Sequence, residues 1–272
     1  MPPRFRVPGS RSITNRALVT AALASGSSTL VDPLDADDTT AMRNCLRALG
    51  VSIDDADSTA WLVVGTGGEL QVPAATLDVG ASGTTGRFIT AVASLVGGPV
   101  EIDGSPRMRE RPIADLANGL RALGASIDLI GAGPGPPLVV GASRPRGRSI
   151  EMDSSKSSQY VSAVMLIAPL LEGDTEIRFV RDVIVSKPYV EMTISTMRSF
   201  GAEVDWIAGP AVRIRGSTGY VAARFEIEPD LSSAVYPAAA AAVSGGRVEL
   251  PGIDQQSHQA DLKFFDVLTA MG

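Results

Sequence analysis

The chain repeats one pattern four times, and this repeat limits the available folds more than any other feature. The heptapeptide RALGVSI at residues 47–53 returns as RALGASI at 121–127. Looser copies are RSFGAEV at 198–204 and LTAMG at 268–272. The glycines of the four copies are 74, 77 and 71 residues apart. Four copies at a near-constant period indicate repeated structural units rather than chance similarity.

An apolar stripe at helical spacing precedes each of the first three glycines. Its members are Met42, Leu46 and Leu49, then Ile113, Leu116, Leu120 and Leu123, then Val190, Ile194, Met197 and Phe200. A glycine just past such a stripe predicts a helix end in the left-handed region of backbone space. An extended segment is expected to follow it.

A second helix start, rich in Ser, Thr and Gly, lies about 40 residues before each glycine. The four starts are at 10–14, 82–85, 157–159 and 232–233, and the small, apolar runs that follow are at 17–24, 88–96, 161–171 and 238–243. Such helices are apolar nearly all round, so we expect them to be buried. A strand-like run separates the two helices, as at 28–31 and 175–179, which predicts units of helix, strand, helix, strand, strand. The Gly-Pro-rich run at 131–137 predicts a hairpin or loop tip.

Composition excludes several classes of protein. Apolar residues make up 44% of the chain and charged residues 20%, as in ordinary globular proteins. The net charge of −6 argues against a general nucleic-acid-binding protein. The single cysteine, Cys45, excludes an internal disulfide and a cysteine zinc cluster, and the single histidine, His258, leaves little histidine-based metal chemistry. The run at 161–171 is too short for a membrane span and no signal peptide is recognisable, so we expect a soluble, cytoplasmic chain without membrane partners.

Arginines accompany several of the helix starts. Arg11 and Arg16 flank the first start, Arg87 follows the second, and a cluster at 107–111 leads into the next helix. A helix N-terminus has free N–H groups and a partial positive charge, which suit phosphate or carboxylate. Guanidinium groups bind the same anions by two-point hydrogen bonding. Hydroxyl residues are also the commonest plain N-caps, so it is the neighbouring arginines that favour an anion site.

Four motifs at these places resemble the EPSP synthase family in order and spacing. They are PGSRSITNRAL at 8–18, PRMRERPI at 106–113, SSQ at 157–159 and SKPY at 186–189. The resemblance covers essentially the whole chain. It implies an α/β (α+β) fold, the inside-out α/β barrel of the enolpyruvyl transferases, built from repeated βαβαββ units of which about four of six are present.

The family fold also implies how the chain divides. Residues 10–227 are expected to form a complete three-unit domain, whereas 1–9 and 228–272 supply only the first strand and first unit of a second domain. About two units are therefore expected to be absent from a C-terminally truncated chain, and the family's proton-accepting Asp lies in that part. Asp230 is not that base, because its place at the fourth helix start predicts an N-cap.

The resemblance implies a reaction with two small-molecule substrates. The 5-hydroxyl of shikimate 3-phosphate attacks C2 of phosphoenolpyruvate while C3 gains a proton, and the tetrahedral intermediate then loses phosphate. The reaction belongs to aromatic amino-acid biosynthesis by the shikimate pathway, needs no metal or organic cofactor, and is carried out by a monomer when the protein is full-length. Because both substrates are polyanions, positioning and electrostatic clamping should dominate catalysis.

The family's functional positions carry over residue by residue. Arg11 stands where a Lys touches both substrates, and it is the one present position with an electrostatic catalytic role. The expected ligands of shikimate 3-phosphate are Arg11, Ser12, Arg16, Ser157, Ser158, Gln159, Ser186 and Tyr189. The expected ligands of phosphoenolpyruvate are Arg11, Gly83, Arg111 and Gln159. At Gly83 a Cβ would also crowd an anion that approaches the backbone.

The chain departs from the family pattern at three of these places. Arg11 replaces a Lys, so a planar fork stands where a compact ammonium is usual. Ala81 stands where Asn or Asp is common, and its side chain cannot form a hydrogen bond. Gly86 stands where Met is usual. These changes are expected to act on substrate affinity and on the choice of substrate.

Two alternative functions stay open at this point. One is a non-catalytic module that binds shikimate 3-phosphate through the complete domain. The other is the related UDP-N-acetylglucosamine enolpyruvyl transferase, which uses a loop Cys, whereas Cys45 lies within a helix stripe. We expect the 272-residue chain alone to lack transferase activity and to be unstable or to associate. The apolar residues that would be poorly covered are Phe264, Phe265, Leu268 and Met271.

Overall fold

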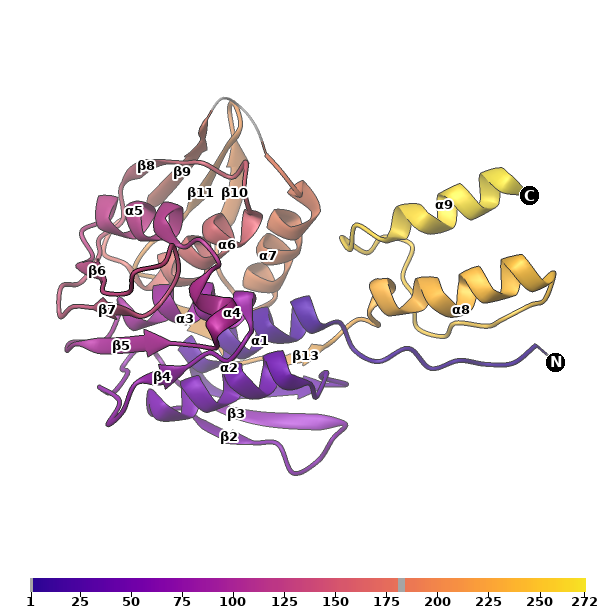
Figure 1. Ribbon diagram of the computed structural model, residues 1–272, viewed down its shortest axis with the longest axis horizontal. Coiled ribbons are helices and arrows are strands. Elements are labelled where there is room, and N and C mark those ends of the chain that lie inside the picture. Colours follow the sequence, from indigo (N-terminus) through magenta and orange to yellow (C-terminus); the bar gives the residue numbers. More distant parts are fainter. Residues whose placement is uncertain (1, 181–183) are drawn as a thin grey trace.

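The computed structural model describes residues 2–180 and 184–272 (Figure 1). Its first unit consists of α1 (Arg11–Leu23), β1 (Ala24–Val31), α2 (Asp37–Ala48), β2 (Ser52–Asp54) and β3 (Ala60–Thr66). The second consists of β4 (Leu77–Asp78), α3 (Gly83–Ala93), β5 (Val100–Asp103), α4 (Pro106–Arg109), α5 (Ala114–Ala122), β6 (Ile127–Leu129) and β7 (Leu138–Val140).

The third unit repeats this order before the chain crosses into a smaller part. It consists of β8 (Ser149–Met152), α6 (Ser158–Ile167), a 3₁₀ turn (Ala168–Leu170), β9 (Thr175–Phe179), α7 (Lys187–Ser199), β10 (Val204–Ile207) and β11 (Ala211–Ile214). After it come β12 (Tyr220–Val221), β13 (Arg224–Glu226), α8 (Leu231–Ser244) and α9 (Leu262–Met271). The predicted unit of helix, strand, helix, strand, strand is therefore confirmed in three copies.

The three units build three sheets of the same design. Their strand orders are β4-β5-β7-β6, β8-β9-β11-β10 and β12-β1-β3-β2, with β13 also pairing with β1. In each sheet the leading strand pairs in parallel with the next one, and the last two strands add antiparallel. The leading strand of the first sheet comes from residues 220–226, which follow the third unit. The chain that follows the third unit thereby pairs with the first unit.

The helices α1, α3 and α6 form the centre of the molecule, and each is in contact with the other two. Residues 13–23 of α1 are all buried, polar side chains included. The sheets lie outside these helices and stay separate, so they do not close a barrel. Small buried residues such as Ala17 and Ala21 let the central helices approach closely. Because these helices are buried on nearly every side, their sequences are apolar nearly all round. The fold class predicted from the sequence is confirmed.

The predicted helix ends are also confirmed. The helices α2, α5 and α7 each end just before a glycine, and Gly50, Gly124 and Gly201 have φ values of +96°, +102° and +83°. A short strand follows each of them. The run at 131–137 forms the turn between the antiparallel strands β6 and β7, as predicted.

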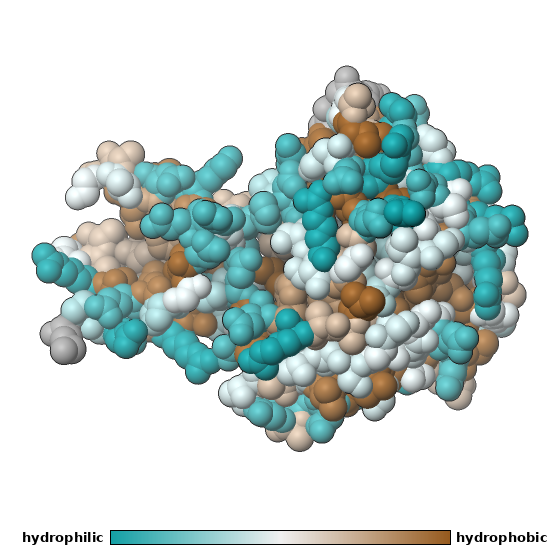
Figure 2. All heavy atoms as spheres, turned by 180° about the vertical axis from the view of Figure 1, so that it is seen from behind, coloured by the Kyte–Doolittle hydropathy of each residue, from teal (hydrophilic) through white to brown (hydrophobic). Residues whose placement is uncertain are grey.

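The chain beyond residue 228 departs from one expectation. The run at 238–243 was expected to be buried like its counterparts, but in α8 the buried residues are Leu231, Ala234 and Ala238, and Val243 is 91% exposed. The reason is that few segments cover α8: its small core is shared with Val7, Leu250, Ile253 and the α9 residues Leu262 and Phe265. By contrast, α1, α3 and α6 pack against one another and against further helices. Figures 1 and 2 show α8 and α9 projecting from the body with hydrophobic residues on their surface.

The first residues likewise form less structure than predicted. The expected strand within 1–9 is present as two isolated bridges, Arg4 to Glu249 and Gly9 to Pro229. The two bridges are isolated, and a continuous strand would need a ladder of neighbouring paired residues. Met1 lies outside the described residues. The expected poor cover of α9 is confirmed, since every one of its residues is partly or fully exposed.

Candidate functional site

Hydrogen bonds link several of the predicted site residues and their neighbours at the N-terminal ends of the three central helices. Arg11 Nη1 donates a hydrogen bond to Asp38 Oδ2 at 3.0 Å, and Thr85 Oγ1 donates to the carbonyl of Asp38 at 3.0 Å. Gln159 Nε2 donates to Thr84 Oγ1 at 3.2 Å. These contacts join the starts of α1, α3 and α6, and we call this place the helix-start site.

The start of α3 is shaped by a glycine and an arginine. Ser82 is its N-cap and accepts a hydrogen bond from the Thr85 N–H at 3.2 Å. A Cβ on Gly83 would overlap the guanidinium of Arg111. The hydrogen bond from Arg111 Nη1 to the carbonyl of Ala81, at 3.4 Å, holds that guanidinium over the helix start. Glycine at this position therefore lets an arginine and a helix N-terminus share one small volume.

A second arginine lies behind this pair. Arg87 is 3% exposed and donates to the carbonyls of Gly83, at 2.9 Å, and Pro112, at 3.0 Å. Its Nε finds no acceptor among the residues that the structure describes. Burial, and then the positive charge of Arg111, lowers the pKa of Arg87. Two guanidinium groups beside a helix N-terminus create a positive potential that an anion would neutralise.

Arg16, one of the predicted ligand residues, is buried beside the helix-start site. It is 2% exposed, and its Nε donates to Thr193 Oγ1 at 2.8 Å. Its other nitrogens donate to the Ser12 carbonyl, the Ser162 hydroxyl and the Tyr189 carbonyl. Burial lowers its pKa to about 10, so it stays charged at neutral pH. In this structure Arg16 ties α1 to α6 and α7, and direct contact with a substrate stays a prediction.

The start of α6 supplies three of the predicted residues. Ser157 is the N-cap, and its hydroxyl accepts from the Gln159 N–H at 3.2 Å. Ser158 is buried, and the amide of Gln159 points to the start of α3, as described above. Tyr160 OH donates to the Pro112 carbonyl at 2.9 Å, which also receives Arg87. The start of α6 and the loop at 111–112 are thus held together.

Arg16 links the start of α7 to α1, because it donates a hydrogen bond to the Tyr189 carbonyl. Ser186 is exposed and has φ +58°, and its carbonyl accepts from the Tyr189 N–H at 2.9 Å. The Tyr189 ring lies 5.9 Å from the Arg16 guanidinium carbon, within cation–π range. All ten predicted site residues are therefore at the starts of α1, α3, α6 and α7 or on the loop after α4.

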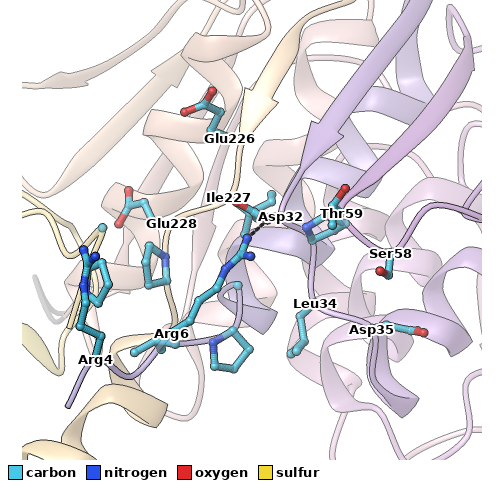
Figure 3. A pocket seen from close by; sticks show the side chains of 17 residues that line it. Arg4, Arg6, Asp32, Leu34, Asp35, Ser58, Thr59, Glu226, Ile227 and Glu228 are labelled. Carbon is cyan, nitrogen blue, oxygen red and sulfur yellow. Dashed lines mark hydrogen bonds and ion pairs between the residues drawn. The ribbon is translucent and has the colours of Figure 1, made fainter. Parts of the chain in front are cut away.

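The helix-start site is separate from a large open hollow elsewhere on the described part of the chain. A cavity of about 950 Å³ lies where the N-terminal segment passes the loop after β1, and none of the predicted site residues lines it. Figure 3 shows Arg6 reaching across to Asp32, with a nitrogen-to-oxygen distance of 2.5 Å. Both partners are exposed, so this ion pair contributes little to stability.

The described residues contain neither a cluster of metal-ligating side chains nor a membrane-spanning helix. Within residues 2–180 and 184–272, no group of three His, Cys, Asp or Glu side chains is placed to hold a metal ion. Over the same residues, no helix has the length and apolar character needed to cross a bilayer.

Comparison with known proteins decides the family. A sequence model described as EPSP synthase (3-phosphoshikimate 1-carboxyvinyltransferase) matches residues 3–272. The chain belongs to the EPSP synthase family. A 3-phosphoshikimate 1-carboxyvinyltransferase of Rhizobium leguminosarum bv. trifolii is 42% identical over 266 residues, which are 97% of this chain and 62% of that protein. One of Salmonella schwarzengrund is 41% identical over 98% of this chain and 63% of that protein.

Solved structures show the same fold. An EPSP synthase from Acinetobacter baumannii superposes with a TM-score of 0.86 at 24% identity, over 99% of this chain and 59% of that one. The chain spans about 62% of the length of the first curated relative.

The structure gives physical content to the departures from the family pattern. The longer Arg11 side chain reaches Asp38, the second residue of α2. Ala81 contributes its backbone carbonyl, not its side chain, to Arg111. At Gly86 a Cβ would lie 2.7 Å from the Met108 Cε, so Met108 already occupies the space that a larger residue would need.

Sequence reasoning missed one residue of the site, Asp38, and noted another, Arg87, only as a neighbour of a helix start. Asp38 is one of two acids in the first turn of α2, which is a common place for acids in helices. Its closeness to the other helix starts is visible only in three dimensions. Arg87 stood four residues after Gly83, a spacing that returns a side chain to the same helix face. By contrast, Asp230 is the N-cap of α8 as predicted, and its Oδ1 accepts from the Ser232 N–H at 3.0 Å.

Proposed function

We propose that this chain carries the shikimate 3-phosphate-binding part of an enzyme that transfers the enolpyruvyl group of phosphoenolpyruvate. The 5-hydroxyl of shikimate 3-phosphate would lose its proton as its oxygen bonds to C2 of phosphoenolpyruvate, and C3 would gain a proton. Inorganic phosphate would then leave C2 while C3 loses a proton, which restores the double bond. The observation that carries the proposal is the pair of arginines, Arg87 and Arg111, at the start of α3.

Phosphoenolpyruvate would bind at Gly83. Its anionic groups would lie between the N-terminus of α3 and the Arg111 guanidinium, with the charge of Arg87 behind them. The hydrogen bond from Arg111 Nη1 to the Ala81 carbonyl is long, at 3.4 Å, and exposed, so the guanidinium can turn toward an anion. Gln159, already hydrogen-bonded to Thr84, would contact both substrates.

Shikimate 3-phosphate would bind beside it, across the starts of α1, α6 and α7. The proposed ligands are Arg11, Ser12, Arg16, Ser157, Ser158, Gln159, Ser186 and Tyr189. Exposed Arg11 is the group best placed to reach both substrates, since 59% of its side chain is accessible although it pairs with Asp38. Arg16 would contribute through its hold on Ser12 and Tyr189.

The domain division is part of the proposal. One hydrophobic core runs from Ile13 to Ile227, and a second contains Val7, Leu231 and Ala234. This supports a complete domain at 10–227 and a partial one from 1–9 and 228–272. The family members compared above are longer by more than a third, so we propose that these 272 residues bind shikimate 3-phosphate without turnover. We further propose that the full-length protein works as a cytoplasmic monomer, independent of nucleic acid and membranes.

The alternative of a UDP-N-acetylglucosamine enolpyruvyl transferase is not favoured. Cys45 is 2% exposed within α2, and burial followed by the charge of Asp78 raises the pKa of its thiol to about 12. A thiol held neutral inside a helix cannot serve as a reactive loop cysteine.

Titration calorimetry with the 272-residue chain tests the proposal. Shikimate 3-phosphate should bind alone, and an assay of phosphate release with both substrates should show no turnover. Turnover at the rate of a complete enzyme would refute the second statement, and absence of shikimate 3-phosphate binding would refute the first.

Gly83→Ala tests the phosphoenolpyruvate position. Its Cβ would displace the Arg111 guanidinium, which is the end of a flexible side chain, so the fold should persist. Phosphoenolpyruvate binding in the presence of shikimate 3-phosphate should weaken at least about tenfold, equivalent to about 1.4 kcal/mol. The control is Gly97→Ala, whose Cβ would lie 3.8 Å from its nearest neighbour, Arg144 Nη2. Equal affinities in the two variants would contradict this assignment.

A further inference from the structure

Two chain segments cross between the two hydrophobic cores, and they reach the helix-start site. The Ser10 N–H donates to the Glu228 carbonyl at 2.8 Å, and the Asp230 N–H donates to the Pro8 carbonyl at 2.8 Å. Gly9 and Pro229 form an antiparallel bridge between these two bonds. We call residues 8–10 and 228–230 the crossing.

The crossing determines where α1 begins. Ser10 is the N-cap of α1, yet among the described residues its hydroxyl accepts no hydrogen bond from the helix N–H groups. Its backbone is held instead by Glu228 on one side and by the Thr14 N–H on the other. Arg11 and Ser12, the next two residues, therefore depend on the crossing for their positions.

A buried amide side chain holds the far side of the crossing. Gln259 is 6% exposed. Its Oε1 accepts from the Leu231 N–H at 3.1 Å, and its Nε2 donates to the Pro229 carbonyl at 2.8 Å and to Glu228 Oε2 at 3.2 Å. Both ends of the amide thus form hydrogen bonds with residues in or directly after the second segment.

The loop that carries Gln259 is fastened to the same carboxylate and touches the larger domain. Ser257 Oγ donates to Glu228 Oε2 at 2.5 Å. Gln259 and Glu228 also line a small cavity together with Ile13 of α1 and Met192 of α7. The loop at 257–259 therefore lies against both the crossing and the helices of the helix-start site.

We propose that Gln259 is a positioning residue for the helix-start site, acting through the crossing on Ser10 and so on Arg11 and Ser12. This inference rests on the proposed function for its effect on ligand binding. Without the amide, the Leu231 N–H and the Pro229 carbonyl would lose partners in a buried place, which is costly. The crossing would then relax at Pro229, directly opposite Gly9.

Hydrogen exchange of the 272-residue chain tests the structural step. In Gln259→Met, which keeps the length of the side chain, the Ser10 amide should exchange about tenfold faster, as expected for a loss of about 1.4 kcal/mol. Ser10 does not touch Gln259, so a local defect at Leu231 would not change its exchange. The control is Gln256→Met, an exposed glutamine on the same loop. Unchanged Ser10 exchange in Gln259→Met would overturn the proposal.

A double-mutant cycle tests the effect on binding. Gln259→Glu places a carboxylate against Glu228 and the Pro229 carbonyl, and should weaken shikimate 3-phosphate binding about tenfold. Adding Glu228→Gln removes the repulsion between the carboxylates and should restore at least about threefold of that loss. If the two side chains were needed only for folding, the double variant would bind shikimate 3-phosphate more weakly than either single variant. That result would overturn the proposal. If the unsubstituted chain does not bind the ligand, the proposed function fails, while the Ser10 exchange still decides whether Gln259 acts on α1.

Discussion

At the scale of single residues, burial changes what the polar side chains of this chain do. Arg16 is predicted to be a ligand, and in the structure its buried guanidinium donates hydrogen bonds to residues of α6 and α7. Arg87 was seen only as a neighbour of a helix start, yet its position behind Gly83 gives the site much of its positive charge. Cys45, the one thiol, is protected by the helix that buries it.

The burial of Cys45 predicts a dependence of stability on pH. Its pKa is about 12 in the folded chain, against 9.0 for a free thiol. The thiol is neutral in both states below pH 9, so this contribution is fully present there. Above pH 9 the unfolded chain loses the proton first, and stability falls as pH rises toward 12.

Urea unfolding of the native chain and of Cys45→Ala at pH 8 and pH 10 measures this contribution. The free energy of unfolding should fall more steeply with pH in the native chain, by up to about 1.4 kcal/mol per pH unit. Other buried groups, such as Tyr220, titrate in both proteins and cancel in the difference. Parallel pH profiles would show that the thiol is not buried in solution.

At the scale of elements, each unit depends on a helix that ends in a left-handed glycine. Gly50, Gly124 and Gly201 turn the chain from a helix into an edge strand, which fixes the register of the hairpin that follows. The turn repeats in all three sheets, so it is a property of the unit and not of one site. This is why the repeat was visible in the sequence.

Gly124→Ala measures how much the left-handed backbone conformation of that turn contributes to the free energy of unfolding. A Cβ at Gly124 would meet no atom within 4 Å among the described residues, but the residue has φ +102°. We expect a loss of about 1–2 kcal/mol in the free energy of unfolding, all of it from the backbone conformation. The measurement is urea unfolding, with Gly97→Ala, which lacks a positive φ, as the control. A loss equal to that of the control would contradict the prediction.

At the scale of the whole molecule, the three-unit body and the part beyond residue 228 differ in how well their apolar residues are covered. The leading strand of the first sheet comes from residues 220–226, which completes the three-unit body. Beyond it, α8 and α9 keep apolar residues in solvent, among them Tyr236, Val243, Val267 and Met271. Figure 2 shows hydrophobic surface on the projecting part. Exposed apolar surface of this kind favours association.

The 272-residue chain is therefore expected to associate with itself in a concentration-dependent way. Sedimentation velocity over a range of concentrations measures this directly. Val243→Ser combined with Met271→Ser should shift the distribution toward monomer, because both side chains are exposed and leave the larger domain untouched. The matched control is Val72→Ser with Ile130→Ser, two apolar residues exposed on the three-unit body. A chain that stays monomeric at all concentrations would contradict the prediction.

Much of the fold followed from the sequence because its signals are local. The apolar stripe at 113–123 and Gly124 define a helix and its end within one short segment, and the same holds for the caps Ser82 and Asp230. Burial of the run at 238–243 was predicted wrongly, because burial depends on what other segments cover a helix. The leading strand at 220–226 was not predicted as part of the first sheet, since its partner lies about 195 residues earlier in the chain.

The sequence by itself determined the repeated unit, the helix ends and the motif residues at the helix starts. Only the tertiary structure decided that Arg111 lies over Gly83, that Arg87 is buried behind them, and that Gln259 holds the crossing beside α1. The physical reason is range. Backbone preferences and helical periodicity act over a few residues, whereas desolvation and charge depend on which distant segments the fold brings together.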